Sequence, residues 1–297
     1  MNDIQKQSAV RAPLAYGSLL LGVSLLAWAP ILVRVAETSA VATAFWRSLL
    51  ALPVFAVILK SQDYRLIQTH WRLFAWCGLG LGGDLALWHM SIARIDVGAA
   101  TVLVNLAPLF VGLWAMSSAR QGIALFFLAH AIALVGVSLL VGVGTDVQSG
   151  AGVMSPLGVA CGLAAAVFNA LYLIAAAKLR PFASARVIMA GTTFVMAIGL
   201  GALALITGGT TIPLSREGWL TLAALALLIQ VFGQGLVIYA LAALPVTFTS
   251  LSLVVQTTGA AVLGWVLFNE VLGHLQIIGA LLAIGAVILA SRTISRR

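Results

Sequence analysis

Ten apolar stretches, each about 20 residues long, follow one another along the chain and restrict its fold more than any other feature. A helix needs about 20 predominantly apolar residues to cross the hydrocarbon core of a bilayer. The connections between the stretches are too short to form a separate soluble domain. The predicted membrane spans are residues 14–36, 40–59, 71–93, 98–117, 124–142, 156–178, 186–207, 218–241, 247–268 and 274–291.

The composition agrees with an all-α integral membrane protein. Hydrophobic residues make up 62% of the chain and charged residues only 8%. A soluble domain carries about 25% charged residues, because its surface must be wetted. This composition excludes a cytosolic enzyme and a disordered chain.

The basic residues are distributed unevenly between the two ends of the predicted spans. Ten spans place both termini on one side of the membrane, where twelve Lys and Arg residues lie, against Arg34, Arg94 and Arg216 on the other side. Because loops rich in Lys and Arg stay in the cytoplasm, we expect both termini to be cytoplasmic in a bacterial inner membrane. The net charge of +8 then reflects topology and contact with anionic lipid rather than nucleic-acid binding.

The two halves of the chain, residues 1–149 and 150–297, show weak internal similarity. Because each half holds five spans, an odd number, the second half enters the membrane from the opposite face. The sequence therefore predicts ten transmembrane helices as a 5+5 inverted-topology repeat, an arrangement typical of transporters whose substrate site lies near the midplane between the halves. Three segment pairs match in the same order: 18–30 with 158–170, 93–103 with 242–252, and 132–140 with 281–289.

Few ionisable residues lie inside the predicted spans, and each is a functional candidate because a charge there costs at least about 2.5 kcal/mol. Arg47 in the second span and Asp84 in the third lie at depths that permit a pair. The pair either ties two helices together or lines a cavity and contacts the carboxylate and amino groups of a zwitterion. A third hypothesis makes Asp84 or His89 a proton relay, whereas His130 is interpreted as a packing residue.

Neutral polar and aromatic residues extend this candidate site. Gln230 and Gln234 lie four positions apart, as do Asp84 and Trp88, and residues at that spacing share a helix face. Such side chains either join helices by hydrogen bonds or form a polar cavity wall. The predicted substrate-binding residues are Trp28, Arg47, Asp84, Trp88, His89, Asn169, Tyr172, Gln230, Gln234 and Tyr239.

Glycines and prolines inside the spans bear on how the helices pack and bend. The glycines at 78, 80, 82 and 83 predict either tight helix packing or a bend that acts in gating. Pro30, Pro53 and Pro108 each remove a backbone hydrogen bond, so kinks are expected in the first, second and fourth spans.

The sequence lacks several signatures of enzymes and cofactor sites. It contains no HExxH, GxSxG or GxxxxGK[ST] motif, and Cys77 and Cys161 lie singly in apolar segments. We therefore predict a protein that is not an enzyme, has no catalytic residue, metal or cofactor, and is not driven by an ATPase of its own. A membrane-embedded enzyme is kept as the alternative from another class.

Four features of the spans form a recognisable pattern: Trp28 late in the first span, Arg47 early in the second, NLAPLFVGLWA (105–115) with Pro108, and VLFNEVL (266–272) with Glu270. They resemble the motifs of the drug/metabolite transporter superfamily, EamA type, and the resemblance covers essentially the whole chain. Within that superfamily the chain is most similar to the YddG-type aromatic amino-acid exporters. Two positions depart from the pattern: residues 117–120 carry no acid, and Gln256 and Thr257 replace a proline expected in the ninth span.

The resemblance implies a secondary transporter that works by alternating access as a monomer. Its implied substrates are amino acids with aromatic or other apolar side chains, which it exports. Other small metabolites or drugs, such as nucleosides or cationic toxins, are the alternative substrates. Facilitated efflux, proton antiport and exchange all fit the sequence.

Overall fold

The computed structural model describes residues 12–92, 94, 100, 103–116, 123–141, 155–268 and 274–294. Within these ranges the chain forms helices joined by short turns and has no strand. The helices are α2 (Ala12–Leu26), α3 (Ala29–Arg34), α4 (Ala40–Ile58), α5 (Ser61–Thr69), α6 (Trp71–Ile92), α8 (Ala107–Met116), α9 (Ile123–Val141), α10 (Pro156–Leu179), α11 (Ala185–Thr207), α12 (Arg216–Ala224), η1 (Leu225–Gly233), α13 (Gln234–Ala240), α14 (Val246–Ser252), α15 (Val255–Phe268) and α16 (His274–Ile294).

Among the described residues, five segments are long and apolar enough to cross a membrane, and they coincide with the first, second, sixth, seventh and eighth predicted spans. The other predicted spans fall on α6, α8, α9, α14 with α15, and α16. The chain is therefore an all-α, multi-pass membrane protein. The five segments are Pro13–Val33, Ala40–Ile58, Pro156–Leu179, Ala185–Thr207 and Arg216–Ala240.

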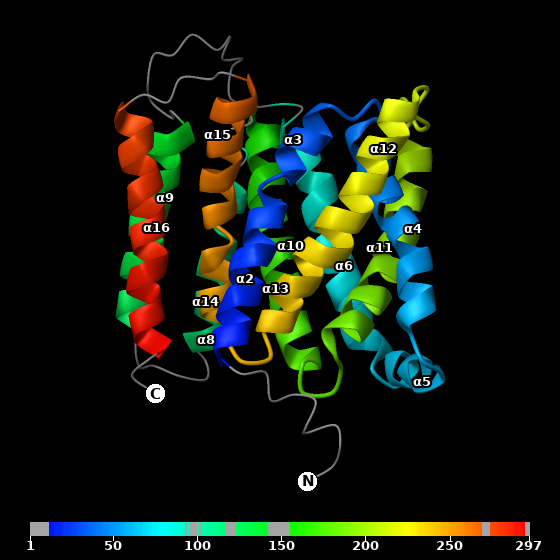
Figure 1. Ribbon diagram of the computed structural model, residues 1–297, viewed down its shortest axis with the longest axis horizontal. Helices are drawn as coiled ribbons and strands as arrows, with labels where there is room; N and C mark the ends of the chain where they lie inside the picture. The colour runs from blue at the N-terminus through cyan, green and yellow to red at the C-terminus, as the bar shows by residue number, and fades with distance from the viewer. Residues whose placement is uncertain are drawn as a thin grey trace.

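The long helices run between two ends of one bundle (Figure 1). The start of α2, the end of α16, helix α5 and the turn at residues 180–184 lie at the lower end in the figure, which we call the terminal end. The connections at residues 35–39 and 208–215 lie at the opposite end, called the far end.

Neighbouring helices pack in a definite pattern. Helix α6 packs along α10, α4 along α11, α2 along α13, and α9 along α16. Glycines permit the closest approaches: a Cβ at Gly22 would lie 3.0 Å from the Gly233 carbonyl oxygen, and one at Gly136 would lie 2.7 Å from the Ala283 nitrogen. Without an aqueous driving force inside the bilayer, such close van der Waals packing is what holds helices together.

Three predicted spans are interrupted by turns rather than continuous. The breaks fall at residues 27–28, 105–106 and 253–254. Pro30 stands in the first turn of α3, and Pro108 in the first turn of α8, where a missing backbone N–H is tolerated. Pro53, by contrast, stays inside the continuous helix α4.

Helix α5 was not expected from the sequence, which predicted only a connection there. Asp63 begins it by accepting the Lys60 backbone N–H at 2.8 Å. Leu66 and Ile67 pack against the core, while Tyr64 is half exposed. A helix with one apolar and one polar face at the end of a bundle is suited to the membrane interface.

Candidate substrate-binding site

A chain of buried hydrogen bonds starts at Arg47 on α4. Its Nε donates to the Oε1 of Gln230 at 2.9 Å, and the Nε2 of Gln230 donates to the Oγ1 of Thr193 on α11 at 3.0 Å. All three side chains are buried, with Arg47 only 4% exposed. The chain joins one helix of the first half to two segments of the second.

A second buried contact joins α6 to α10. The Nδ2 of Asn169 donates to the Oδ2 of Asp84 at 2.7 Å. The two helices approach closely at two glycines, which have no Cβ. A Cβ at Gly80 would lie 2.7 Å from the Tyr172 nitrogen, and one at Gly83 would lie 2.5 Å from the Phe168 ring. Since α6 runs unbroken from Trp71 to Ile92, these glycines act in packing in this structure.

Tyr172 connects this contact to the eighth predicted span. Its hydroxyl donates to the Oε1 of Gln234 at 3.4 Å and also faces the sulfur of Met189 at 3.7 Å. The side chain is almost completely buried. Two of the predicted residues, Asn169 and Tyr172, thus meet different partners from one face of α10.

Arg47 and Asp84 lie near each other but do not form a direct ion pair. Within the described ranges, the side chains close enough for an ion pair are those of Arg186 and Asp63, at 3.1 Å. The charges of Arg47 and Asp84 do act on each other electrostatically. The prediction that their depths permit pairing is therefore met only in part. Each charge has taken a neutral partner, Gln230 or Asn169, from the second half of the chain.

Several buried polar atoms around Arg47 and Asp84 have no hydrogen-bond partner. They are the Nη2 of Arg47, the Nε1 of Trp88 and the Nε2 of His89. The Nδ1 of His89 lies 2.8 Å from the Ala40 carbonyl oxygen, which can only accept, so Nδ1 carries the proton. In a neutral ring Nε2 is then an acceptor. The site presents two unpaired donors and one unpaired acceptor beside a carboxylate.

Buried polar groups without a partner are rare and need an explanation. Each costs about 1–3 kcal/mol when its hydrogen bond is missing. Three of them lie on α4 and α6, on Arg47, Trp88 and His89, and each has capacity for a hydrogen bond to a bound molecule.

Two predicted residues lie apart from this cluster. Trp28 is 39% exposed and occupies the break between α2 and α3. Tyr239 acts electrostatically on Arg180 at the terminal end, not on Arg47 or Asp84. His130 is fully buried with both ring nitrogens unpartnered, and its ring stacks on Phe126.

The sequence reasoning missed Thr193 and the contact of Asn105 with Thr257. The adjacent threonines at 192 and 193 in an otherwise apolar span were the available signal. The Nδ2 of Asn105 donates to the Oγ1 of Thr257 at 3.1 Å, which joins the break at 105–106 to the first turn of α15, just after the break at 253–254. The predicted boundary at residue 149, Glu270 and residues 117–120 lie outside the described residues.

Side-chain contacts also tie the two halves together at both ends of the bundle. At the terminal end, the Nη2 of Arg186 lies 3.1 Å from the Oδ2 of Asp63. At the far end, Glu37 accepts from the Ser215 hydroxyl and from its backbone N–H, the latter at 3.1 Å. Nearby, the Trp46 indole donates to the Thr211 carbonyl.

Part of the chain is similar in sequence to a known family, and the whole fold is similar to a solved structure. Residues 156–292 match the EamA-like transporter family. No curated protein sequence matches the chain. A solved crystal structure with 16% sequence identity superimposes with a TM-score of 0.77, over 95% of this chain and 98% of its own, a likeness that concerns the fold alone. Over residues 156–292 the chain is therefore similar to transporters of the EamA-like family.

Proposed function

We propose that the chain is a ten-span secondary transporter built as a 5+5 inverted repeat, with residues 1–149 and 150–297 as its halves, and that it exports amino acids with aromatic or other apolar side chains. In this proposal the protein lies in a bacterial inner membrane, both termini face the cytoplasm, and the functional unit is a monomer. The unpaired donors and acceptor beside Arg47 and Asp84 carry the substrate part of this proposal.

The pattern of helix packing supports the repeat. If spans one to five are exchanged with spans six to ten, the packing of α6 on α10 becomes that of α13 on α2, and both occur. Likewise α6 on α11 becomes η1 on α4, and α8 on α10 becomes α15 on α2. The pairs α4 with α11, α8 with α14, and α9 with α16 map onto themselves.

Two of the three breaks and the contacts at the two ends follow the same exchange, whereas the break at 27–28 has no counterpart in the continuous helix α10. The breaks at 105–106 and 253–254 fall in the fourth and ninth spans, which are counterparts. The contact of Asp63 with Arg186 joins the connection after span two to that after span six. Its counterpart joins the connections after spans seven and one, where Ser215 meets Glu37. Alternating access then requires these two contacts to break in turn.

The chemistry of the central cluster fits a zwitterion. The free Nη2 of Arg47 and the indole N–H of Trp88 are donors for a carboxylate, and charge-assisted hydrogen bonds of this kind are the strong ones. Asp84 and the Nε2 of His89 are acceptors for an ammonium group. Discontinuous helices and a polar site between two repeats are typical of secondary transporters.

Uptake of labelled Phe, Trp or Met into liposomes that contain the purified protein tests the proposal, with and without a pH gradient. We expect saturable uptake without a gradient. Uptake that needs the gradient would make Asp84 and His89 the coupling residues. If nucleosides or cationic drugs are taken up and amino acids are not, the substrate assignment is wrong.

A pair of variants on α6 makes the site assignment sharper. Trp88→Phe removes one donor and keeps an aromatic ring, whereas Trp76→Phe makes the same change at a half-exposed position of the helix. A lost hydrogen bond to a charged group is worth about 1.5–3 kcal/mol, so the half-saturating concentration should rise about tenfold or more in Trp88→Phe. Equal kinetics in both variants would remove Trp88 from the site.

A further inference from the structure

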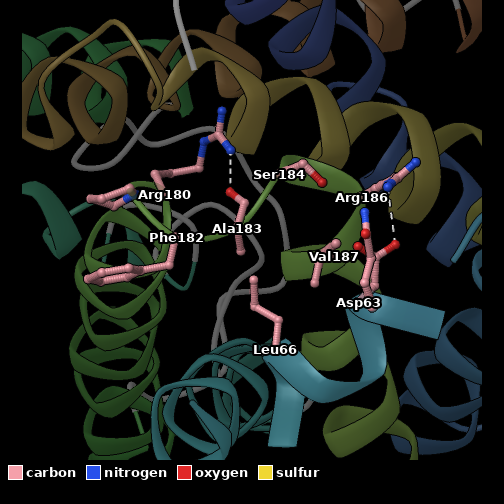
Figure 2. A pocket seen from close by; sticks show the side chains of 10 residues that line it. Asp63, Leu66, Arg180, Phe182, Ala183, Ser184, Arg186 and Val187 are labelled. Carbon is pink, nitrogen blue, oxygen red and sulfur yellow. Dashed lines mark hydrogen bonds and ion pairs between the residues drawn. The ribbon is translucent and has the colours of Figure 1, made fainter. Parts of the chain in front are cut away.

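A cavity of about 260 Å³ opens at the terminal end, away from the central cluster. It lies between α5 and the turn that leads from α10 into α11 (Figure 2). Arg180, Ser184 and Arg186 line one side, and Asp63 and Leu66 line the other. Neither guanidinium group takes part in the proposed transport site, and the contact of Arg186 with Asp63 gives no role to Arg180.

Arg180 is buried and has no acidic partner at ion-pair distance among the described residues. The residue is 9% exposed, its Nη1 donates to the Ala183 carbonyl at 2.6 Å, and its buried Nε has no partner. Burial lowers the pKa of Arg180, because a desolvated cation is unfavourable unless an anion is near. The carbonyl contact satisfies one N–H group and supplies no charge.

Arg186 stands on the other side of the same turn, as Figure 2 shows. Its Nη2 pairs with Asp63 at 3.1 Å, and its buried Nε has no partner either. Asp63 also accepts the Lys60 backbone N–H at 2.8 Å. The carboxylate of the cavity wall is thus already engaged and leaves Arg180 uncompensated.

The first turn of α11 adds backbone donors to the same wall. Ser184 is the N-cap of this 23-residue helix, yet its side chain accepts no N–H group from the helix. The amino end of a helix carries a partial positive charge, and its free N–H groups favour an anion. An adjoining cavity that shares Gln62 is lined by Lys60 and Arg65 and extends the positive region.

We propose that this cavity binds a phosphate group, and that the phosphodiester of an anionic membrane lipid supplies it. The free guanidinium N–H groups and the α11 backbone amides are all donors, and phosphate oxygens accept strong, charge-assisted hydrogen bonds from such groups. Exposed aromatic side chains at the same end, Tyr64, Trp71 and Phe182, belong to the headgroup level of a membrane. The proposal does not depend on which substrate the protein carries.

Native mass spectrometry of the full-length protein in detergent tests it, with dioleoyl phosphatidylglycerol as the probe and dioleoyl phosphatidylcholine as the uncharged comparison. Inorganic phosphate is added as a competitor. Displacement of the lipid by phosphate means that the free anion enters the same site. If phosphate does not displace the lipid, but lipid binding depends on Arg180 and Ser184, the phosphate is recognised as part of a headgroup. Both results support a phosphate site.

Two variants and a control locate the binding. Arg180→Gln removes the uncompensated cation, and Ser184→Asp places a carboxylate over the α11 amides while keeping a good N-cap, so that its helix still folds. Each should weaken phosphatidylglycerol binding about tenfold or more. Arg72→Gln removes a charge near α5 that lines neither cavity and should bind like wild type.

The proposal is overturned if all four proteins bind phosphatidylglycerol equally, or if Arg72→Gln weakens binding as much as Ser184→Asp does. Equal binding of phosphatidylglycerol and phosphatidylcholine by the wild type, unaffected by inorganic phosphate, would also overturn it.

Discussion

Replacing Gly80 by Ala tests whether the contact of α6 with α10 holds the central site in place. A Cβ at Gly80 would lie 2.7 Å from the nitrogen and 2.9 Å from the Cα of Tyr172, and 2.9 Å from the Phe168 carbonyl oxygen. These are backbone atoms, so no side-chain rotation relieves the overlap. The two helices must move apart one turn from Asp84, whose bond to Asn169 is 2.7 Å long.

The expected magnitude follows from two opposing effects. Overpacking a tight contact costs about 1–3 kcal/mol, while Ala in a helix interior is favoured over Gly by about 0.5–1 kcal/mol. Gly199→Ala isolates the second effect, because no atom lies within 4 Å of its added Cβ on α11. Gly80→Ala should therefore be less stable than Gly199→Ala by about 1–3 kcal/mol.

A third variant separates packing from function. Gly136→Ala meets backbone atoms at 2.7 Å on α16, in a helix pair that holds no residue of the central cluster. Unfolding in mixed micelles should show both Gly80→Ala and Gly136→Ala destabilised, whereas transport per folded molecule should fall only in Gly80→Ala. Equal stability of Gly80→Ala and Gly199→Ala would refute the reasoning.

Three further predictions concern the site and the far end. Asp84→Asn keeps the shape but removes the charge that faces an ammonium group, so liposome uptake should fall while the amount of protein in the membrane stays unchanged. Trp28→Ala should also lower transport, because the Trp28 side chain stands at the break between α2 and α3; normal uptake by both variants would contradict the assignment of these residues to a substrate cavity. Hydrogen bonds from Ser215 hold the pKa of Glu37 below its ordinary value of 4.5. The contact stabilises the fold above that value and is lost as the pH falls through the lower pKa of the folded state. Wild type should therefore lose thermal stability more steeply than Glu37→Gln below about pH 4.5, and parallel curves would speak against this contact.

The membrane spans were predictable because they depend on little besides local composition. A run of about 20 apolar residues has few alternatives to a transmembrane helix. Helix α5 was missed because local composition does not determine it. Its nine residues carry both polar and apolar side chains, and the helix is stabilised by packing of Leu66 and Ile67 against the core. Pro30 and Pro108 predicted kinks close to the breaks at 27–28 and 105–106. The break at 253–254 has no proline near it and was not predicted.

The residues of the central site could be nominated from the sequence, but their pairing could not. The depth of a residue in the membrane follows from its position in a span. Arg47 and Asp84 were therefore predicted to lie at depths that permit a pair. Which partner each takes depends on how the helices are rotated about their axes, and packing at Gly80 and Gly83 decides this for α6. Neutral partners from the second half therefore replaced the direct ion pair.

The eighth predicted span contains a change in helix geometry that the sequence did not predict. Gln230 and Gln234 lie four residues apart and were expected to share a face, as they do in an α-helix. Leu225–Gly233 instead form a π-helix, in which the hydrogen bonds run from i to i+5. Gln230 contacts Arg47 and Thr193, and Gln234 contacts Tyr172. π-Helical turns are rare overall but frequent at functional sites, and this segment carries Gln230, the residue that connects Arg47 in the first half of the chain to Thr193 in the second.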